Sequence, residues 1–431
     1  MQITNSYEAI AFINRKNILF RVHFVYFCRM SKTTYAQFEF IALMASLMSI
    51  VALSIDALLP ALNLIGISIG TANVVDNQLL ITMIFLGLGI GPLFFGPISD
   101  SLGRKPIVYI GIFLFIIASV ICIFSESIEM MVAGRILQGI GLSAPRTISI
   151  AMVRDTFDGD YMARIMSFIT VVFLLVPIVA PAMGQFVLNH YNWQAIFIIQ
   201  LVFSLLIAFW FWKRQPETLH KEYRVKFTSH IFMNGLKEIL KAKRTIGFTI
   251  ISGFVTGAFM VYLSTAQQVF QIQYDLKDQF PFIFAGIAIA ISAATFLNGT
   301  LVIKYGMEKM VTISLVGFFG VSLLYVALFY NSANPSIAVF LTFLSVQFFA
   351  IGFLFGNLRA LAMQPIGHIA GIGAAITGFI STLMAVPLST FIGRFVISTA
   401  LPLFMGFLIC SLFSLLILVY LKKSKKQVES L

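Results

Sequence analysis

Charged residues and cysteines are scarce in this sequence. Only 11% of its 431 residues are charged, whereas 59% are hydrophobic, and this balance excludes an ordinary soluble domain. The three cysteines, Cys28, Cys122 and Cys410, are scattered along the chain, so they form neither a disulfide framework nor the spacing of a metal site. We therefore expect no metal and no cofactor, and we interpret the cysteines as packing residues.

Motifs of membrane-embedded enzymes are also missing. The sequence has no H-E-x-x-H zinc motif, no G-x-x-x-x-G-K-[ST] loop for nucleotide hydrolysis, and no second carboxylate deep in an apolar run to form an acid pair. A channel pore usually needs rings of repeated polar groups or subunit symmetry. We therefore expect a carrier rather than an enzyme or a channel.

Long apolar runs dominate the chain. A bilayer core about 30 Å thick needs roughly 20 mostly apolar residues per helix, and the sequence contains about twelve such runs. They cover residues 38–62, 78–98, 106–124, 130–153, 163–188, 193–212, 245–269, 280–303, 310–330, 335–358, 370–395 and 400–421. The runs predict an all-α membrane protein with twelve transmembrane helices embedded in the lipid bilayer.

The basic residues fall almost entirely on one side of these predicted helices. With both termini in the cytoplasm, the inner segments hold 25 of the 29 Lys and Arg, the outer loops hold only Lys277, and Arg135, Arg146 and Arg394 lie within helices. This is the positive-inside pattern. A nucleic-acid-binding protein would instead cluster its charge on one soluble face, so we expect no nucleic acid partner despite the net charge of +12.

The start of the chain lacks a short apolar core followed by a small-residue cleavage site, so we expect no removable signal peptide. Residues 1–29 mix aromatic and basic side chains without a helical period, and the sequence from Met30 onward reads like a complete start. Our hypothesis is that Met30 is the true initiator. The alternative is that residues 1–37 form a disordered cytoplasmic tail.

The longest polar stretch, residues 213–244, contains nine basic residues and divides the chain near its middle. It predicts a cytoplasmic linker between a six-helix bundle at 38–212 and a second at 245–421, followed by a basic cytoplasmic tail at 422–431. Within the linker, residues 230–243 place apolar and basic side chains at helical spacing. We expect a short helix there, lying on the cytoplasmic membrane surface.

An internal repeat supports two bundles. The sequence GPISDSLGRK begins at Gly96 and the sequence GTLVIKYGMEK begins at Gly299. Gly96 and Gly103 are seven residues apart, as are Gly299 and Gly306, and the offset between the two copies matches the spacing of the first and seventh helices. The pattern favours two pseudo-symmetric six-helix bundles.

The first copy resembles the signature loop of the major facilitator superfamily, G-x-x-x-D-R-x-G-R-K. The resemblance implies the major facilitator fold and a conformational latch, although Ser101 stands where the family usually has a basic residue. The alternative is an ordinary polar turn. The latch residues that it implies are Gly96, Asp100, Gly103, Arg104 and Lys105.

Two further motifs resemble those of the same family. Arg135, Gln138 and Gly139 look like its R-x-x-Q-G motif, and PIVAPAMG, which contains Pro177, Pro181 and Gly184, resembles the antiporter motif of its fifth helix. Ala180 and Gln185 replace two of that motif's glycines. Since proline and small residues kink and pack membrane helices in many proteins, the alternative is a purely structural role.

Several short strings resemble the bicyclomycin/chloramphenicol-resistance (Bcr/CflA) type of drug efflux protein. They are SID at 54–56, LPA at 59–61, WQAIF at 193–197, PETL at 216–219 and NG at 298–299. The resemblance implies a monomeric multidrug:proton antiporter of the inner (cytoplasmic) membrane that exports small amphipathic molecules and confers antibiotic resistance. The alternative is a proton-coupled symporter or an exporter of one specific metabolite.

Asp56 is the only carboxylate well inside a predicted span. An ionisable group at that depth costs several kcal/mol, so it is a functional candidate. The fourth helix runs in the opposite direction, and Arg135 lies near its outer start, at a depth in the membrane similar to that of Asp56. The two residues could therefore pair. A contact that forms in one conformation and breaks in the other would change the proton affinity of the carboxylate. We predict a proton-coupling role for both; the alternative is a permanent structural ion pair.

Six polar residues are candidates for the substrate cavity. Arg146 lies eleven residues after Arg135, which at about 100° per residue returns it to nearly the same helix face, and Gln138 and Ser149 share that side. Arg146 could recognise an anionic or carbonyl-bearing substrate group, or it could simply hold its helix to backbone carbonyls. The other candidates are Tyr262, Gln267 and Asn298.

Overall fold

The computed structural model describes residues 37–71, 73–225 and 229–429. Helices are the only regular secondary structure in this part of the chain, which contains no strands. The predictions about Met30 and residues 1–36 fall outside these residues. Eleven helical stretches are long and apolar enough to cross a membrane, and one of them, Ile337–Gly393, holds two helices joined at a kink. The described residues therefore make the twelve crossings that the apolar runs predict.

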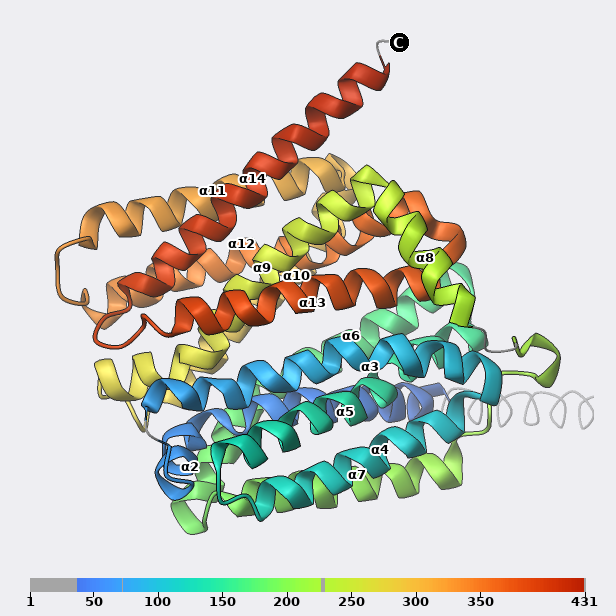
Figure 1. The fold of residues 1–431 in the computed structure, drawn as a ribbon, viewed down its shortest axis with the longest axis horizontal. Helices are drawn as coiled ribbons and strands as arrows, with labels where there is room; N and C mark the ends of the chain where they lie inside the picture. The colour runs from blue at the N-terminus through green and yellow to red at the C-terminus, as the bar shows by residue number, and fades with distance from the viewer. Residues whose placement is uncertain (1–36, 72, 226–228, 430–431) are drawn as a thin grey trace, which may run out of the picture.

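The helices form two bundles that lie side by side in Figure 1. The N-terminal bundle comprises Gln37–Ser68, which ends in η1 (Leu59–Ala61) and α2 (Leu62–Ser68), then η2 (Val74–Gln78), α3 (Leu79–Leu102), α4 (Arg104–Ile123), α5 (Ile128–Thr156), α6 (Gly159–His190) and α7 (Gln194–Arg214). The connecting segment holds η3 (Lys221–Tyr223) and α8 (Ser229–Lys241). The C-terminal bundle comprises α9 (Lys243–Gln267), η4 (Gln268–Gln273), α10 (Phe280–Tyr305), α11 (Met307–Phe329), α12 (Ile337–Met363), η5 (Gln364–Ile369), α13 (Ala370–Gly393) and α14 (Leu401–Glu429).

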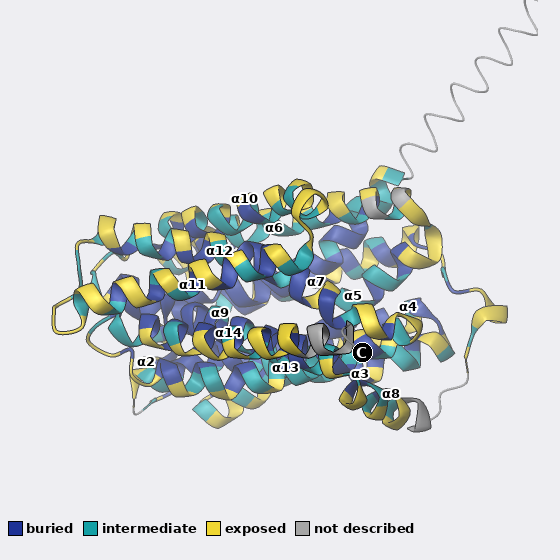
Figure 2. Cartoon of the chain, turned by 90° about the horizontal axis from the view of Figure 1, so that it is seen from above, coloured by how far each residue is buried: buried dark blue, intermediate teal, exposed yellow. Residues whose placement is uncertain are grey.

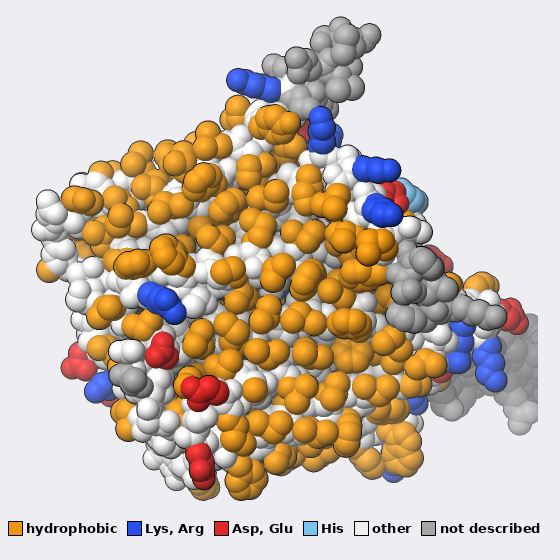
Figure 3. Space-filling model, viewed as in Figure 1, with side chains coloured by type: hydrophobic (Ala, Val, Ile, Leu, Met, Phe, Trp, Pro, Cys, Tyr) orange, Lys and Arg blue, Asp and Glu red, His pale blue; other side chains and the backbone are white. Residues whose placement is uncertain are grey.

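The two ends of the molecule differ in charge. Figure 3 shows hydrophobic side chains over the middle of one face, Lys and Arg gathered toward the end where α8 lies, and acidic side chains at the opposite end. We call these the basic end and the acidic end. The acidic end carries Asp76, Glu126, Glu129, Asp275 and Asp278 in or beside its helix connections. The apolar belt between the ends is the surface that a bilayer would cover.

Several helices extend further at the basic end than the apolar runs predict. α3 continues to Leu102, α4 begins at Arg104, and α12 continues to Met363, because charged residues prolong a helix into water without loss of its backbone hydrogen bonds. Arg359 therefore lies in a helix rather than in a connection.

The prediction that Arg394 lies inside a helix is wrong: it follows the last residue of α13 and is exposed.

Close approach of α5 to its neighbours organises the N-terminal bundle. A methyl group on Gly139 would lie 2.0 Å from the carbonyl oxygen of Ile84 on α3, and one on Gly141 would lie 2.7 Å from that of Gly111 on α4. Small residues at such positions let membrane helices pack backbone against backbone. As a result α5 is largely buried, as Figure 2 shows by its dark colour, and its side chains reach both α3 and α4.

The glycine repeat is confirmed as a repeated backbone turn. Gly103 has φ of 109° and Gly306 has φ of 79°, and each residue joins two helices of its bundle. Such positive φ values favour glycine because other residues meet a clash between Cβ and the backbone. The turn between α3 and α4 therefore recurs between α10 and α11.

The predicted linker helix is also confirmed, but its apolar face is covered by protein. α8 places Phe232, Leu236 and Ile239 in a small cluster with Ile366 and Ile376 of the C-terminal bundle. We expected this face to lie on lipid, because the sequence pattern of an amphipathic helix does not distinguish the two apolar surroundings. The packing instead fixes the connection to the basic end of the C-terminal bundle.

We expect Gly139→Ala to lower the stability of the protein. The added methyl group would force α5 away from α3, and overpacking of this kind costs about 1–3 kcal/mol. The measurement is the thermal unfolding midpoint of the purified protein in detergent. The control is Gly286→Ala on α10, where a methyl group would meet no atom within 4 Å. Equal midpoints for the two variants would contradict this account of the helix contact.

Candidate functional site

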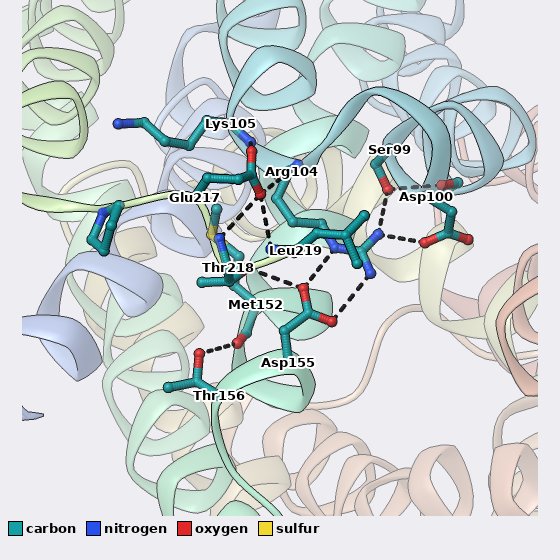
Figure 4. Close-up of polar contacts among 12 residues, drawn as sticks. Ser99, Asp100, Arg104, Lys105, Met152, Asp155, Thr156, Glu217, Thr218 and Leu219 are labelled. Carbon is teal, nitrogen blue, oxygen red and sulfur yellow. Dashed lines mark hydrogen bonds and ion pairs between the residues drawn. The ribbon is translucent and has the colours of Figure 1, made fainter. Parts of the chain in front are cut away.

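Arg104 is the centre of a polar cluster at the basic end (Figure 4). Its guanidinium donates two hydrogen bonds to Asp155 on α5, with N···O distances of 2.8 and 3.1 Å, and others to Asp100 at 2.5 Å and Ser99 at 2.8 Å. Fork-shaped contacts of this kind are among the strongest hydrogen bonds in proteins. These bonds tie the turn after α3, which carries the signature loop, to the end of α5, the helix that carries the R-x-x-Q-G motif.

Glu217, which follows the last helix of the N-terminal bundle in the sequence, completes this cluster. Its carboxylate accepts the backbone N–H groups of Arg104 at 2.9 Å and Lys105 at 3.0 Å, which are the first two residues of α4. The first N–H groups of a helix have no partner within it and carry partial positive charge, so a carboxylate there stabilises the helix start. The PETL string therefore belongs to the same site as the signature loop.

The two glycines of the signature loop differ in role. Gly103 has its positive φ value and lies against Glu217: a Cβ atom there would be 2.7 Å from the carboxylate. Gly96 lies inside α3, where a side chain would meet no atom within 4 Å. Of the two, only Gly103 makes the turn, because α3 continues past Gly96.

Arg135 is fully buried and bonds to neutral acceptors. It donates to the carbonyl of Leu80 at 2.7 Å, to the carbonyl of Ser54 at 3.1 Å and to the side chain of Gln138 at 2.7 Å. Gln138 in turn donates to Ser119 on α4 at 2.9 Å. Arg135 thus holds α3, α5 and the first spanning segment together.

Asp56 lies beside this group without joining it. It ends the helix of residues 37–56 and is only 5% exposed, and no hydrogen bond or ion pair links it to Arg135 or to another described residue. The group that interacts with it electrostatically is Tyr262 of α9, from the other bundle. The hydroxyl of Tyr262 is buried without a hydrogen-bond partner, while its ring packs 4.4 Å from that of Phe348. Asp56 and Tyr262 therefore lie near each other where the bundles meet.

The antiporter motif packs directly behind Asp56. A methyl group on Gly184 of α6 would lie 2.0 Å from the carbonyl oxygen of Ala57 and 3.2 Å from a ring carbon of Pro60. Pro177 and Pro181 lie in the preceding turns of the same helix. The motif thus touches the turn that ends the helix carrying Asp56, a contact that the spacing in sequence could not predict.

Of the six predicted cavity residues, four hydrogen-bond within their own bundle. Gln138 bonds as described above, Ser149 donates to the carbonyl of Pro145 at 2.6 Å, Gln267 donates to Gln271 at 2.9 Å, and Asn298 accepts from Asn357 at 2.7 Å. A role for them in the cavity stays a prediction. The other two, Tyr262 and Arg146, have no hydrogen-bond partner among the described residues.

A hydrogen-bonded contact joins the bundles near the acidic end. The side-chain amide of Gln78 donates to Gln268 of η4 and to the carbonyl of Gly393 at the end of α13, both at 3.1 Å. Both hydrogen bonds cross from the N-terminal bundle to the C-terminal bundle. Elsewhere the bundles meet by packing of α3 on α13 and of α6 on α10.

We expect Arg104→Gln to destabilise the protein. The change leaves Asp155 and Asp100 without their cation, and the loss of such charged hydrogen bonds costs on the order of 2 kcal/mol. The thermal unfolding midpoint measures it. Lys105→Gln is the matched control, since it removes the same charge from the next residue, whose side chain forms no ion pair with a described residue and whose backbone bond to Glu217 is kept. An equal fall in both variants would refute the role given to the cluster.

Comparisons with known proteins agree with this architecture. A family model described as the Major Facilitator Superfamily matches residues 40–387. The chain is 28% identical over 347 residues to a bicyclomycin resistance protein homolog of Haemophilus influenzae, covering 79% of this chain and 85% of that protein. It is 25% identical over 338 residues to the multidrug resistance protein MdtL of Citrobacter koseri, covering 77% and 83%.

A solved structure gives the same fold. A partially occluded inward open conformation of the xylose transporter XylE from E. coli aligns with a TM-score of 0.67 at 14% identity, covering 90% of this chain and 97% of that one. The resemblance to the Bcr/CflA type is therefore confirmed by relatives, and the twelve-helix fold by structure. The chain belongs to the major facilitator superfamily and is a multi-pass membrane transporter of small molecules rather than an enzyme.

Proposed function

We propose that the protein exports drugs or other small amphipathic compounds in exchange for protons, by alternating access across the bacterial inner membrane. The observation that supports this most is the position of Asp56, buried where the two bundles meet and close to Tyr262 of the opposite bundle. The names of the bicyclomycin- and multidrug-resistance relatives support drugs as substrates. We also propose that the chain acts as a monomer and that its basic end faces the cytoplasm, with both termini there.

Asp56 is suited to carry the proton because nothing in the described structure permanently neutralises it. A bare carboxylate at membrane depth costs several kcal/mol, and a proton removes that cost. When the cavity opens toward the acidic end, which faces outward in this proposal, the carboxylate takes up a proton from outside. When the cavity opens toward the basic end, stabilisation of the ionised carboxylate lets the proton leave to the cytoplasm. Proton release is thereby coupled to the direction in which the cavity opens.

Arg135 is suited to sense the same movement. It already holds the carbonyl of Ser54, two residues before Asp56 in the same helix. A shift of this helix end relative to α5 would exchange that neutral acceptor for the carboxylate, and an ion pair would then favour the ionised form. Conformation-dependent pairing of Asp56 and Arg135 thus remains our proposal for the coupling step.

Export is favoured over uptake by the resemblance of the helix motif at Pro177, Pro181 and Gly184 to an antiporter motif, and by the names of the resistance relatives. Gly184 of this motif also lies against Ala57, so α6 supports the turn that follows the proposed proton site. The alternative, a symporter or an exporter of one metabolite, would use the same proton site. The side on which substrate accumulates in inverted vesicles separates the two directions of transport.

We expect Asp56→Asn to reduce drug-driven proton exchange at least tenfold, because the amide cannot bind and release a proton. The measurement is the proton flux that added drug evokes in energised inverted vesicles, together with drug susceptibility of an efflux-deficient host. Asp76→Asn at the acidic end is the control, because Asp76 lies in η2 before the start of α3. Undiminished exchange by Asp56→Asn at normal expression would eliminate the proposal.

We expect Gly184→Ala to impair transport by the protein that still folds, in addition to the loss of stability that such a clash brings. The methyl group would displace α6 from the turn at Ala57, so the geometry around Asp56 would change while the two bundles remain assembled. The assay is the same proton flux, normalised to protein that elutes as a single species in detergent. Gly299→Ala on α10, where a methyl group meets open space, should transport normally. Full activity of Gly184→Ala would show that this contact has no part in coupling.

A further inference from the structure

Two arginines without carboxylate partners approach each other from opposite bundles. Arg146 lies on α5 and Arg359 lies on α12, and their like charges are close enough to repel. Arg146 is partly buried and Arg359 is exposed, so both side chains remain accessible. Because they come from opposite bundles and lie close to each other, they are placed between the bundles.

Three other arginines toward the basic end are paired with carboxylates. Arg104 bonds to Asp155 at 2.8 Å, Arg214 bonds to Glu39 at 2.6 Å, and Arg244 pairs with Glu308. Arg146 and Arg359 have neither an ion pair nor a hydrogen bond to any described residue. Two like charges that approach each other repel, and no carboxylate among the described residues offsets the repulsion here. The pair therefore lacks the negative group that would stabilise it.

The surroundings of Arg359 add an apolar surface to this positive charge. Phe355 lies four residues earlier on the same helix, which places it one turn away on the same face. Its ring packs edge-on against that of Phe259 on α9, with the ring centroids 5.4 Å apart, and both rings are only partly buried. A ligand that reaches the arginines with a charged group can therefore place an aromatic or aliphatic body against these rings.

We propose that Arg146 and Arg359 together bind an anionic group of the transported compound, such as a carboxylate, sulfonate or phosphate. Each guanidinium offers a planar set of donors that matches these oxyanions. The inference rests on the proposed export function, since it names the substrate class for the same path: amphipathic organic anions or zwitterions. The sequence alone predicts an anionic or carbonyl-bearing substrate contact for Arg146 as one of two alternatives. The structure adds Arg359 from the second bundle as its neighbour.

The location of the pair also links binding to movement. α5 and α12 belong to different bundles and do not pack extensively against each other. Without substrate, repulsion between the two arginines favours separation of the bundles at this level. A bound anion neutralises the repulsion and gives both bundles a shared partner, so substrate binding favours closure on the side from which the substrate entered.

The test uses two dyes that share a xanthene scaffold and differ in charge. The purified full-length chain in lipid nanodiscs is titrated with fluorescein, an anion, and with rhodamine 123, a cation, and binding is followed by fluorescence anisotropy. We expect Arg146→Gln and Arg359→Gln each to weaken fluorescein binding by about tenfold or more. Rhodamine 123 should bind the variants as well as the wild type or better, and Arg→Lys at either position should retain most of the fluorescein affinity.

Arg154→Gln is the matched control, because Arg154 lies on the same helix, is exposed and forms no ion pair with a described residue. Unchanged fluorescein affinity in both Gln variants, or a wild type that fails to bind fluorescein, would overturn the inference. If a Gln variant does not fold, competition in the wild type decides: benzoate should displace fluorescein and benzylamine should not, and the reverse result rejects the anion site.

The same preparations keep this inference distinct from the proposed function. Proton-driven export of rhodamine 123 without arginine-dependent fluorescein binding would leave the export proposal standing and reject the anion site. Arginine-dependent fluorescein binding without any drug-evoked proton flux would support the anion site and reject proton-coupled export.

Discussion

Burial of charge within the membrane spans is the constraint on which the arrangement of this transporter depends. The fully buried guanidinium of Arg135 is satisfied by two backbone carbonyls and the amide of Gln138, all of them neutral. Because neutral acceptors satisfy the cation, the nearby carboxylate of Asp56 is not consumed in a permanent ion pair. The same bonds join three membrane spans, so the group that leaves Asp56 unpaired also fixes its position.

The two halves of the chain repeat a backbone turn but not its chemistry. Gly103 and Gly306 occupy equivalent positions with positive φ values, yet only the first is surrounded by the acids that hold Arg104. In the second bundle, Glu308 follows Gly306 and pairs with Arg244 at the start of α9. In place of the charged cluster of the N-terminal bundle, the second bundle has an ion pair between α9 and α11 at this position.

The sequence predicted those features that depend on local composition and failed on those that depend on depth and partners. Apolar runs locate the twelve spans, and paired glycines locate the repeated turn, because both are properties of adjacent residues. The apolar run at 335–358 ends just before Arg359, whereas α12 continues to Met363. Helical spacing correctly placed Gln138 near Arg135, but it could not show that the amide points toward Ser119 on α4 rather than into a cavity.

The hydrogen bonds of Gln78 determine what it takes to separate the bundles near the acidic end. Both are neutral amide-to-carbonyl contacts, each with a net contribution of about 1 kcal/mol. When they break, no opposite charges are pulled apart, so these two contacts themselves depend little on dissolved salt. Separation of the bundles at this end therefore exposes to water two glutamine side chains and the apolar surface beneath them.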